Sequence, residues 1–500
     1  MQYGLTMFLL QPNKYILTHK EGGIKEQESA IQYRKRRMSM KEKKQATLSH
    51  ALFTIIVLIA SLFLGIVTFG ADPHIPLLIG VIVAGAVAIF ALNYTWEEVE
   101  SSIIDGIKLA MQAILILMII GTLVGTWLLS GTVPTLIYYG LEILAPGIFL
   151  IATLLICSIV ALSIGSSWTT AATIGIALIG VGTGFGLPPG AVAGAVVSGA
   201  YFGDKMSPLS DTTNLSPAMA GGDLFTHIKY MIWTTAPAYV ISLIFFGVLG
   251  ASYTTEALDP GGIIEIQDAL SGAFNLNPLL VIPPLLVIVI VIFKVPAIPG
   301  LLAGTILGGI FAAIFQGAGM ADIIDAAHYG YYVDTGVEVV DDLISGGGLD
   351  YMMWTVSLII IALSLGGIME STGMLKAIGA FILKFAKGTG SLVLATILSC
   401  IFINLVSGDQ YLALVVPGRM YKTTYEERGL SPRVLSRALE GGGTLTSPFI
   451  PWNTCGAFMY SVLGVHPFVY APFAVFNYTV PVINVIYAYI GFKIEKIEAE

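Results

Sequence analysis

The chain of 500 residues is 56% apolar and 11% charged, with a formal net charge of −8 and a mean hydropathy of +0.84. Soluble proteins carry about twice that charged fraction, and soluble cores of this length do not bury so much apolar surface. The composition therefore excludes a soluble enzyme and a nucleic-acid-binding protein, and its three scattered cysteines exclude a disulfide-stapled secreted domain. It predicts a protein whose solvent is the lipid bilayer.

The first 45 residues form a basic tail. They hold ten of the 24 Lys and Arg residues, including the run Arg34–Arg37, and they precede the first long apolar run, at 51–70. A basic segment beside the first span predicts a cytoplasmic N-terminus, and the apolar stretch at 7–10 is too short for a signal peptide. We expect residues 1–45 to be disordered. Translation from Met38 or Met40 is an alternative interpretation.

Apolar runs follow one another from residue 51 to residue 491. A span needs about 20 apolar residues, which predicts an all-α polytopic membrane protein with about 11–13 membrane elements. Shorter apolar pieces near 133–145, 189–203, 374–386 and 447–464 fit broken helices or re-entrant hairpins better than ordinary spans.

Basic residues orient the connections between these runs. No Lys or Arg occurs from 295 to 375, which predicts that the loop at 316–350 is external. Basic residues at 376–387, 419–437 and 493–496 predict cytoplasmic connections and a cytoplasmic C-terminal tail, 492–500.

The two halves of the chain share a weak pattern. Ser207-Pro208 recurs as Ser447-Pro448, and the polar block at 165–168 occupies the same place as the block at 407–410. The charge rule gives matching spans opposite directions, which predicts an inverted repeat of about five to six elements per half, as in many secondary transporters. The predicted parts are a first repeat, 50–255, an external linker, 256–275, and a second repeat, 276–491. A channel or a membrane enzyme built by duplication is the alternative.

Polar residues interrupt the apolar runs of the first half at two places. Ser166 and Thr169 lie in the block Gly165–Thr170, where either a cavity or helix–helix hydrogen bonding explains them. The segment Gly203–Asn214 follows a run rich in Gly and Ala, and Pro208 favours unwound backbone there. Such backbone at membrane depth is tolerated where it lines a cavity or is buried in protein. A solvated cytoplasmic loop remains an equal interpretation of this segment.

Oxygen-bearing side chains of these types are hard ligands that suit hard cations. The candidate ligands of the first half are Asp204, Ser207, Ser210, Asp211, Thr212, Thr213 and Asn214. An ionised Asp at the bilayer centre costs about 2.5–3.5 kcal/mol, so an intramembrane acid predicts a function.

The second half repeats the pattern with fewer acids. Asp409 follows a 17-residue apolar run and is the leading acid there, with Asn404 and Gln410 as supporting polar residues. A Gly-rich segment that starts at Glu440 contains the further candidate oxygen ligands Ser447, Asn453 and Thr454.

Other site chemistries lack their motifs. The six histidines have no metal-binding spacing and there is no phosphate-binding loop, so we expect no transition metal, no cofactor and no enzyme activity. Gly-Asp dipeptides at 203–204 and 408–409 raise the alternative of an intramembrane aspartyl protease, but the context that such chemistry requires is missing.

From about residue 50 to residue 490 the chain resembles the NhaC family of sodium/proton antiporters. The resemblance is carried by Gly203–Asn214 with its continuation to His227, and by the blocks Gly165–Thr170 and Asp409–Ala413. It implies a bacterial inner-membrane antiporter with Na⁺ in the cation site, in a superfamily of inverted repeats and hairpins. It also implies an alternative, because relatives exchange carboxylates such as malate and lactate together with Na⁺ and H⁺.

These observations lead to one hypothesis, which is alternating access with Na⁺ and H⁺ competing for intramembrane carboxylates. Asp204, Asp211 and Asp409 are the leading acids. The expected partners are the bilayer, small ions and, in the alternative, small carboxylates; homo-oligomerisation stays open. A passive ion channel is a further alternative from a different class.

Overall fold

The computed structural model describes residues 43–253, 260–293 and 295–497, and these residues are helical apart from turns and two isolated bridges. The predicted tail therefore lies, apart from residues 43–45, outside the described residues, as do the last three residues of the chain. The described part of the predicted linker contains one helix, α13 (Pro260–Ala273).

Eight helices in the described part are long and apolar enough to cross a membrane, and a ninth span results if the pair Ile263–Ala273 and Pro278–Ile290, bent by 99°, is counted as one. The eight are Leu48–Ile66, His74–Ala91, Met111–Leu129, Pro146–Ile164, Leu224–Tyr253, Ala297–Phe315, Leu349–Ser371 and Thr389–Ser407. The prediction of 11–13 elements also counted interrupted pieces. Two of these, 374–386 and 447–464, contain the short apolar helices Met374–Leu383 and Thr454–Leu463, and a third short apolar helix is Val475–Ile490.

The first half starts with two helices that each end in a π-helical turn. In chain order its elements are α2 (Leu48–Leu62), η1 (Phe63–Thr68), α3 (His74–Ala86), η2 (Val87–Ala91), α4 (Trp96–Leu109), α5 (Met111–Leu129), α6 (Thr132–Ile143), α7 (Pro146–Ile164), α8 (Ser167–Thr170), η3 (Ala171–Gly175), α9 (Ile176–Gly184), α10 (Pro189–Met206), α11 (Asp211–Ala220) and α12 (Leu224–Tyr253).

After α13 the second half has the same mixture of long and broken helices. Its elements are η4 (Pro278–Val281), α14 (Ile282–Ile292), α15 (Ala297–Phe315), α16 (Met320–Tyr329), α17 (Glu338–Ile344), α18 (Leu349–Ser371), α19 (Met374–Leu383), α20 (Thr389–Ser407), α21 (Gln410–Glu427), α22 (Pro432–Leu439), η5 (Glu440–Thr444), η6 (Ser447–Phe449), α23 (Thr454–Leu463), α24 (Pro467–Tyr470) and α25 (Val475–Ile490).

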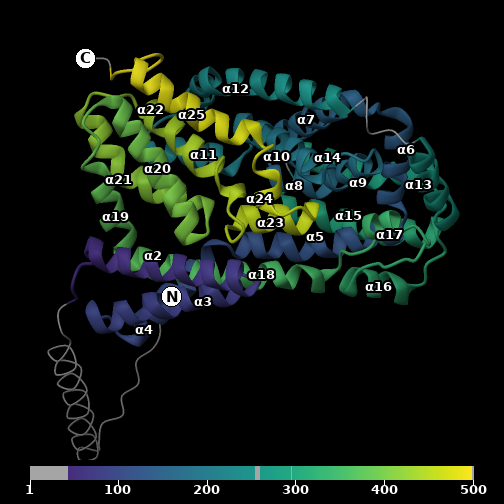
Figure 1. The fold of residues 1–500 in the computed structure, drawn as a ribbon, viewed down its shortest axis with the longest axis horizontal. Helices are drawn as coiled ribbons and strands as arrows, with labels where there is room; N and C mark the ends of the chain where they lie inside the picture. Colours follow the sequence, from purple (N-terminus) through teal and green to yellow (C-terminus); the bar gives the residue numbers. More distant parts are fainter. Residues whose placement is uncertain (1–42, 254–259, 294, 498–500) are drawn as a thin grey trace, which may run out of the picture.

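Burial separates central helices from peripheral ones. The most apolar window of α18 is 72% buried, and this helix packs against α3, α4 and α5, whereas the windows of α2 and α12 are 28% buried (Figure 1). Large apolar side chains cover the outside, with Phe69, Phe90 and Ile143 at 77%, 83% and 77% exposure. An apolar outer surface of this extent is what a lipid environment requires.

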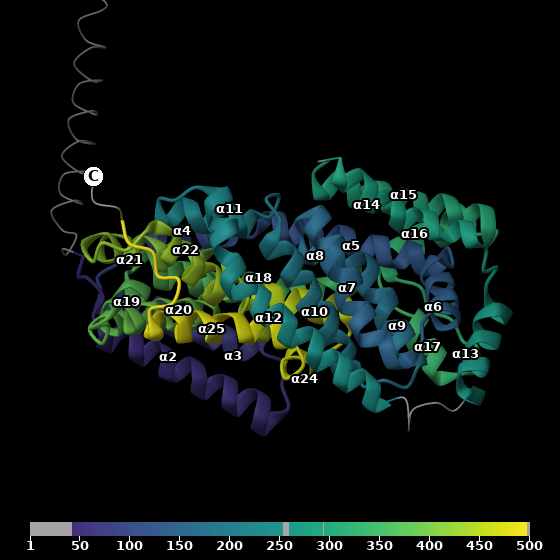
Figure 2. The same ribbon diagram turned by 90° about the horizontal axis from the view of Figure 1, so that it is seen from above.

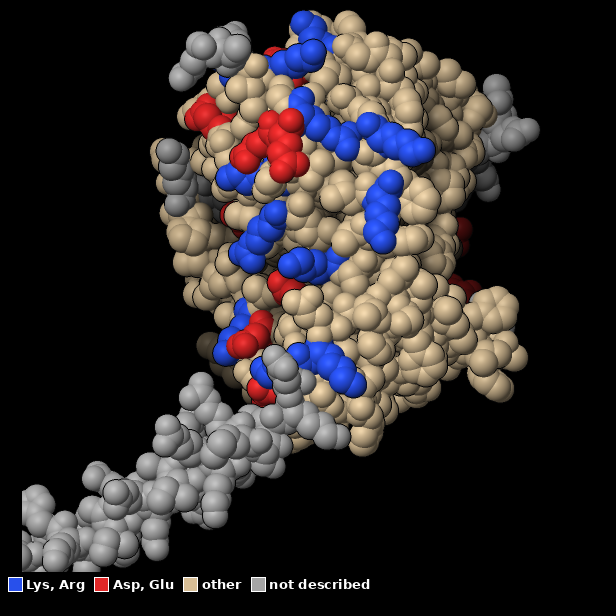
Figure 3. Space-filling model, turned by 90° about the vertical axis from the view of Figure 1, so that its left-hand side faces the viewer, with Lys and Arg blue, Asp and Glu red and all other residues tan. Residues whose placement is uncertain are grey.

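Helices α2, α3, α5 and α18 run roughly along the long axis of the molecule, which has two ends of different character (Figures 1 and 2). One end carries α19, α21, α22 and the C-terminus, and Figure 3 shows that Lys and Arg side chains gather on this face. The other end carries α6, α13, α16 and α17 (Figure 1). The first end thus carries basic connections, and the second carries α16 and α17 from the stretch 316–350, which has no Lys or Arg.

Candidate functional site

The first break in the helices follows α7. The chain turns at Gly165, whose φ is +76°, and Ser166 then caps α8 by accepting a hydrogen bond from the amide of Thr169 at 3.1 Å. Ser166 also accepts a hydrogen bond from the Thr169 hydroxyl at 3.1 Å. In the structure these two side chains therefore hydrogen-bond within their own turn rather than between helices.

The second break separates α10 from α11. The chain is unwound over residues 207–210, where Pro208 cannot supply a helical N–H, and Ser210 caps α11. Thr213 donates to the carbonyl of Lys205 at 3.0 Å, and Asn214 donates to the carbonyls of Pro208 and Ser210 at 2.9 and 2.7 Å. The turn is therefore held by side chains of the helix that follows it.

Asp204 joins these two breaks. It lies in the last turn of α10, is 8% exposed, and its Oδ2 accepts hydrogen bonds from the backbone N–H and the hydroxyl of Ser167 at 3.1 and 2.7 Å. The carboxylate at the end of α10 thus accepts a hydrogen bond from the first amide of α8.

The second half supplies a third break, between α20 and α21. Gly408 has a φ of +67°, and Asp409 caps α21 by accepting a hydrogen bond from the amide of Leu412 at 2.9 Å. The carbonyl of Gly408 accepts a hydrogen bond from the amide of Thr454 at 2.8 Å, which brings the start of α23 to this break.

Two asparagines tie the Gly-rich segment to α20. Asn404 donates to the carbonyl of Gly443 at 2.6 Å, and Asn453 donates to the side-chain oxygen of Asn404 at 3.1 Å. Ser447 donates to the carbonyl of Thr444 at 2.7 Å and is fully buried. The side chains of Asn404, Asn453 and Ser447 are thus occupied by hydrogen bonds within the protein, which leaves little donor or acceptor capacity for a ligand.

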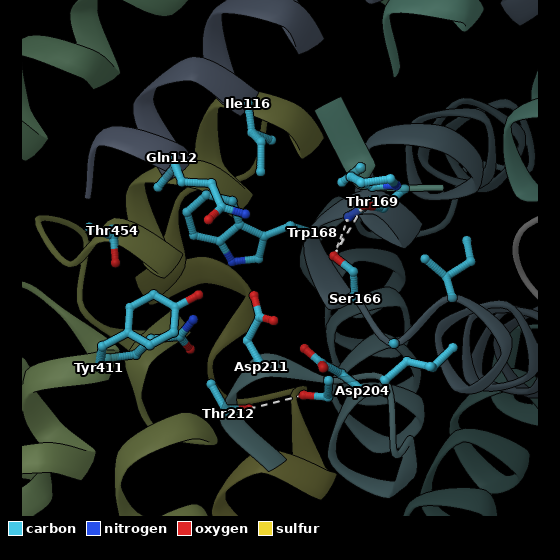
Figure 4. A pocket seen from close by; sticks show the side chains of 18 of the residues that line it. Gln112, Ile116, Ser166, Trp168, Thr169, Asp204, Asp211, Thr212, Tyr411 and Thr454 are labelled. Atoms are coloured by element: carbon cyan, nitrogen blue, oxygen red, sulfur yellow. Dashed lines mark hydrogen bonds between the residues drawn. The ribbon is translucent and has the colours of Figure 1, made fainter. Parts of the chain in front are cut away.

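The breaks surround one cavity of about 630 Å³ (Figure 4). Carboxylates from both halves line it, namely Asp204, Asp211 and Asp409. Figure 4 shows Asp211 between Asp204 and Tyr411, with Trp168 on another wall of the cavity. Among the residues that the structure describes, none that lines the cavity is Lys, Arg or His.

The cavity gathers nine of the fifteen side chains that the sequence singled out. These are Asp204, Asp211, Asp409, Ser210, Thr212, Thr454, Ser166, Thr169 and Gln410. The other six lie outside its lining and bond to backbone or to one another; they are Ser207, Thr213, Asn214, Asn404, Ser447 and Asn453.

Some residues of the site were not singled out from the sequence. Trp168 and Tyr411 line the cavity, and each lies within two residues of a side chain that was singled out, so the polar blocks themselves signal them. Gln112 lines the cavity from the first turn of α5 and is a lone polar residue in an apolar run. Glu440 lies behind the cavity wall, fully buried, with both carboxylate oxygens bonded to α11.

Comparison with known proteins gives consistent matches. The family model described as "Na+/H+ antiporter family" matches residues 199–492. The Na⁺/H⁺ antiporter NhaC of Alkalihalophilus pseudofirmus is 40% identical over 454 residues, which cover 91% of this chain and 98% of that protein.

Two proteins of Bacillus subtilis are similar to nearly the same extent. Its Na⁺/H⁺ antiporter NhaC is 40% identical, covering 88% of this chain and 96% of its own length. Its malate-2H⁺/Na⁺-lactate antiporter is 38% identical, covering 88% of this chain and 95% of its own length.

Proposed function

Because the chain belongs to the NhaC-type Na⁺/H⁺ antiporter family, and is thus a multi-pass secondary transporter, we propose that it exchanges Na⁺ for H⁺ by alternating access, with the two ions competing for the carboxylates of the cavity. The observation that carries the proposal is the convergence of Asp204, Asp211 and Asp409 on one cavity lined from both halves of the chain.

The chemistry of the lining suits a small hard cation. Ionised carboxylates and the neutral oxygens of Ser210, Thr212 and Thr454 are ligands that hard cations prefer. A protonated carboxyl loses its charge and part of its acceptor capacity, so a proton that binds there weakens the binding of Na⁺. Exchange follows when binding of either ion allows the site to change sides.

Within the cavity we assign the first role to Asp211. Asp204 already accepts two hydrogen bonds from Ser167, and Asp409 caps α21. Asp211, at the start of α11, is the most exposed of the three carboxylates and interacts with Tyr411 (Figure 4). Its oxygens are thus the most available to an arriving ion.

The alternative is coupled exchange of carboxylates, the activity in the name of the second Bacillus subtilis relative. An organic dianion needs positive charge or aligned N–H groups. The described residues of the cavity lining include three acids and no basic side chain. Lys205 points away from the cavity, with its Nζ 3.1 Å from the sulfur of Met231 on α12. This charge balance supports cation exchange.

We also propose a bacterial inner-membrane location with both termini in the cytoplasm. The support is the gathering of Lys and Arg on the end that carries the C-terminus (Figure 3), because basic connections are retained on the cytoplasmic side.

The test is transport by the purified protein in liposomes with an acidic interior and a trapped pH dye. NaCl added outside should alkalinise the interior. Asp211→Asn should reduce the rate to that of empty liposomes, whereas Asp268→Asn, which neutralises an exposed acid on α13, should transport like the unaltered protein.

The same liposomes separate the two candidate functions. If the dye responds only when malate is added outside and lactate is enclosed, the function is carboxylate exchange. If it responds under neither condition, the proposal is wrong.

A further inference from the structure

Glu440 is a fully buried acid that does not line the cavity. It stands at the start of η5, a π-helical turn of the second half, where the chain leaves α22. Its Oε1 accepts a hydrogen bond from the hydroxyl of Thr212 at 3.2 Å, and its Oε2 accepts one from the hydroxyl of Ser216. Both donors lie on α11, one helical turn apart.

The two bonds give each oxygen of this fully buried carboxyl group a hydrogen-bond partner on α11. Positive charge is close by. Lys205 is also fully buried, and Glu440 acts electrostatically on it, as it does on Asp204 and Cys400. Burying an ion without such partners would cost several kcal/mol.

Thr212 connects this acid to the cavity. The side chain of Thr212 lines the cavity next to Asp211, and its hydroxyl also lies 3.2 Å from that of Ser210 (Figure 4). Ser216, one turn later, does not line the cavity. Glu440 is thus bonded to the buried side of α11, and the first turn of α11 carries the candidate cation ligands.

We propose that Glu440 is a positioning residue for the cation site: by binding the hydroxyls of Thr212 and Ser216 it fixes the first turns of α11 against η5, and so sets the affinity of the cavity for Na⁺. The inference rests on the proposed function. Its basis is a buried, doubly hydrogen-bonded carboxylate that links the broken segment of one half to the π-helical turn of the other. π-Helical turns frequently occur at functional sites.

If Glu440 served only to pack two helices together, its substitution would have a different effect on Na⁺ affinity. Residues that orient metal ligands from outside the first ligand shell typically change metal affinity by about 10–100-fold when altered. A residue that merely holds two helices together would lower the amount of folded protein, and would leave the affinity of the folded fraction unchanged.

The test measures the Na⁺ concentration that gives half-maximal proton exchange, separately from the maximal rate, in the liposomes described above. Glu440→Gln should raise this concentration at least about tenfold. Ser216→Ala, which removes one of the two hydroxyls bonded to Glu440, should raise it less, and Ser216→Thr, which keeps a hydroxyl at this position, should leave it close to the original value. Adding Ser216→Ala to Glu440→Gln should cause little further change, because both alter one interaction.

Thr396→Val is the matched control. It removes a buried hydroxyl that pairs with Tyr425 at 2.9 Å and does not touch Glu440. It should leave the half-saturating concentration unchanged.

Unchanged Na⁺ affinity in Glu440→Gln overturns the inference, and so does full additivity with Ser216→Ala. If Glu440→Gln does not fold, the two Ser216 variants decide the question, since an unaltered affinity in Ser216→Ala would equally overturn it. Failure of the proposed function is seen earlier, as an unaltered protein that moves no protons when Na⁺ is added.

Discussion

Gly165 controls the close contact between the two broken segments of the first half. Its φ of +76° is a left-handed conformation that costs other residues about 1–2 kcal/mol. A Cβ at this position would lie 2.6 Å from the Cβ of Leu209 and 2.8 Å from its carbonyl carbon. Glycine is therefore needed both for the turn and for the approach of the 207–210 linker.

We expect Gly165→Ala to impair transport by pushing Leu209 and the adjacent Ser210 away from the cavity. Gly373→Ala is the matched control, because Gly373 has a similar φ of +79° but nothing within 4 Å of its would-be Cβ. Both variants should be destabilised by the cost of placing alanine in a left-handed conformation. In thermal unfolding and liposome assays, Gly165→Ala should lose additional stability and most of its transport rate. Equal behaviour of the two variants would contradict the role of this contact.

At the scale of elements, α4 is bound to the segment before α2 by one ion pair. Nζ of Lys43 lies 2.7 Å from Oε1 of Glu98, and the amide of Lys44 donates to the carbonyl of Leu92 at 3.1 Å. The hydrogen bond from Lys43 holds the pKa of Glu98 below its ordinary value. Because the folded-state pKa is lowered, the pair stabilises this contact above pH 4.5, the ordinary value, and the stabilisation is lost as the pH falls through the lowered pKa.

Glu98→Gln should therefore speed hydrogen exchange of the Lys44 amide at pH 7 without a measurable change in global stability, since a partly exposed pair contributes about 0–1 kcal/mol. Glutamine still serves in the cap with Thr95, so the start of α4 should keep its protection. Asp105→Asn, which breaks the exposed pair with Lys108, should leave the Lys44 amide unaffected. Unchanged exchange in Glu98→Gln would show that the ion pair does not hold the segment.

Helix breaks were more predictable than the contacts between them. Gly, Pro and hydroxyl residues inside apolar runs mark the breaks at Gly165, Pro208 and Gly408, because each residue disturbs a helix locally. The contact of Glu440 with Thr212 joins residues 228 positions apart, and no local property of either residue specifies the other. The same holds for Gln112, which reaches the cavity only through the packing of α5.

For the whole molecule, hydropathy was enough to predict an all-helical membrane protein but not to fix the number of spans. Helix α10, with its buried Asp204 and Lys205, is not apolar enough to be counted as a span although it lies in the interior. Buried charged residues thus lower the mean hydropathy of a helix that lies inside the protein. Together with the short apolar helices Met374–Leu383, Thr454–Leu463 and Val475–Ile490, such helices make the number of long apolar helices in the described residues smaller than the number of elements expected from the sequence.

Orientation in the membrane can be tested with single cysteines, because Cys157, Cys400 and Cys455 are all buried in the structure. Asp325, exposed on α16, and Lys376, exposed on α19, lie at opposite ends of the molecule (Figures 1 and 2). In intact spheroplasts a membrane-impermeant maleimide should label Asp325→Cys at once, because the connection at 316–350, which lacks Lys and Arg, should face outward. It should label Lys376→Cys only after the membrane is permeabilised, because basic connections stay in the cytoplasm. The protein without either substitution should remain unlabelled throughout. The reverse pattern of labelling would place the basic end outside and invert the direction in which the cavity must deliver its ions.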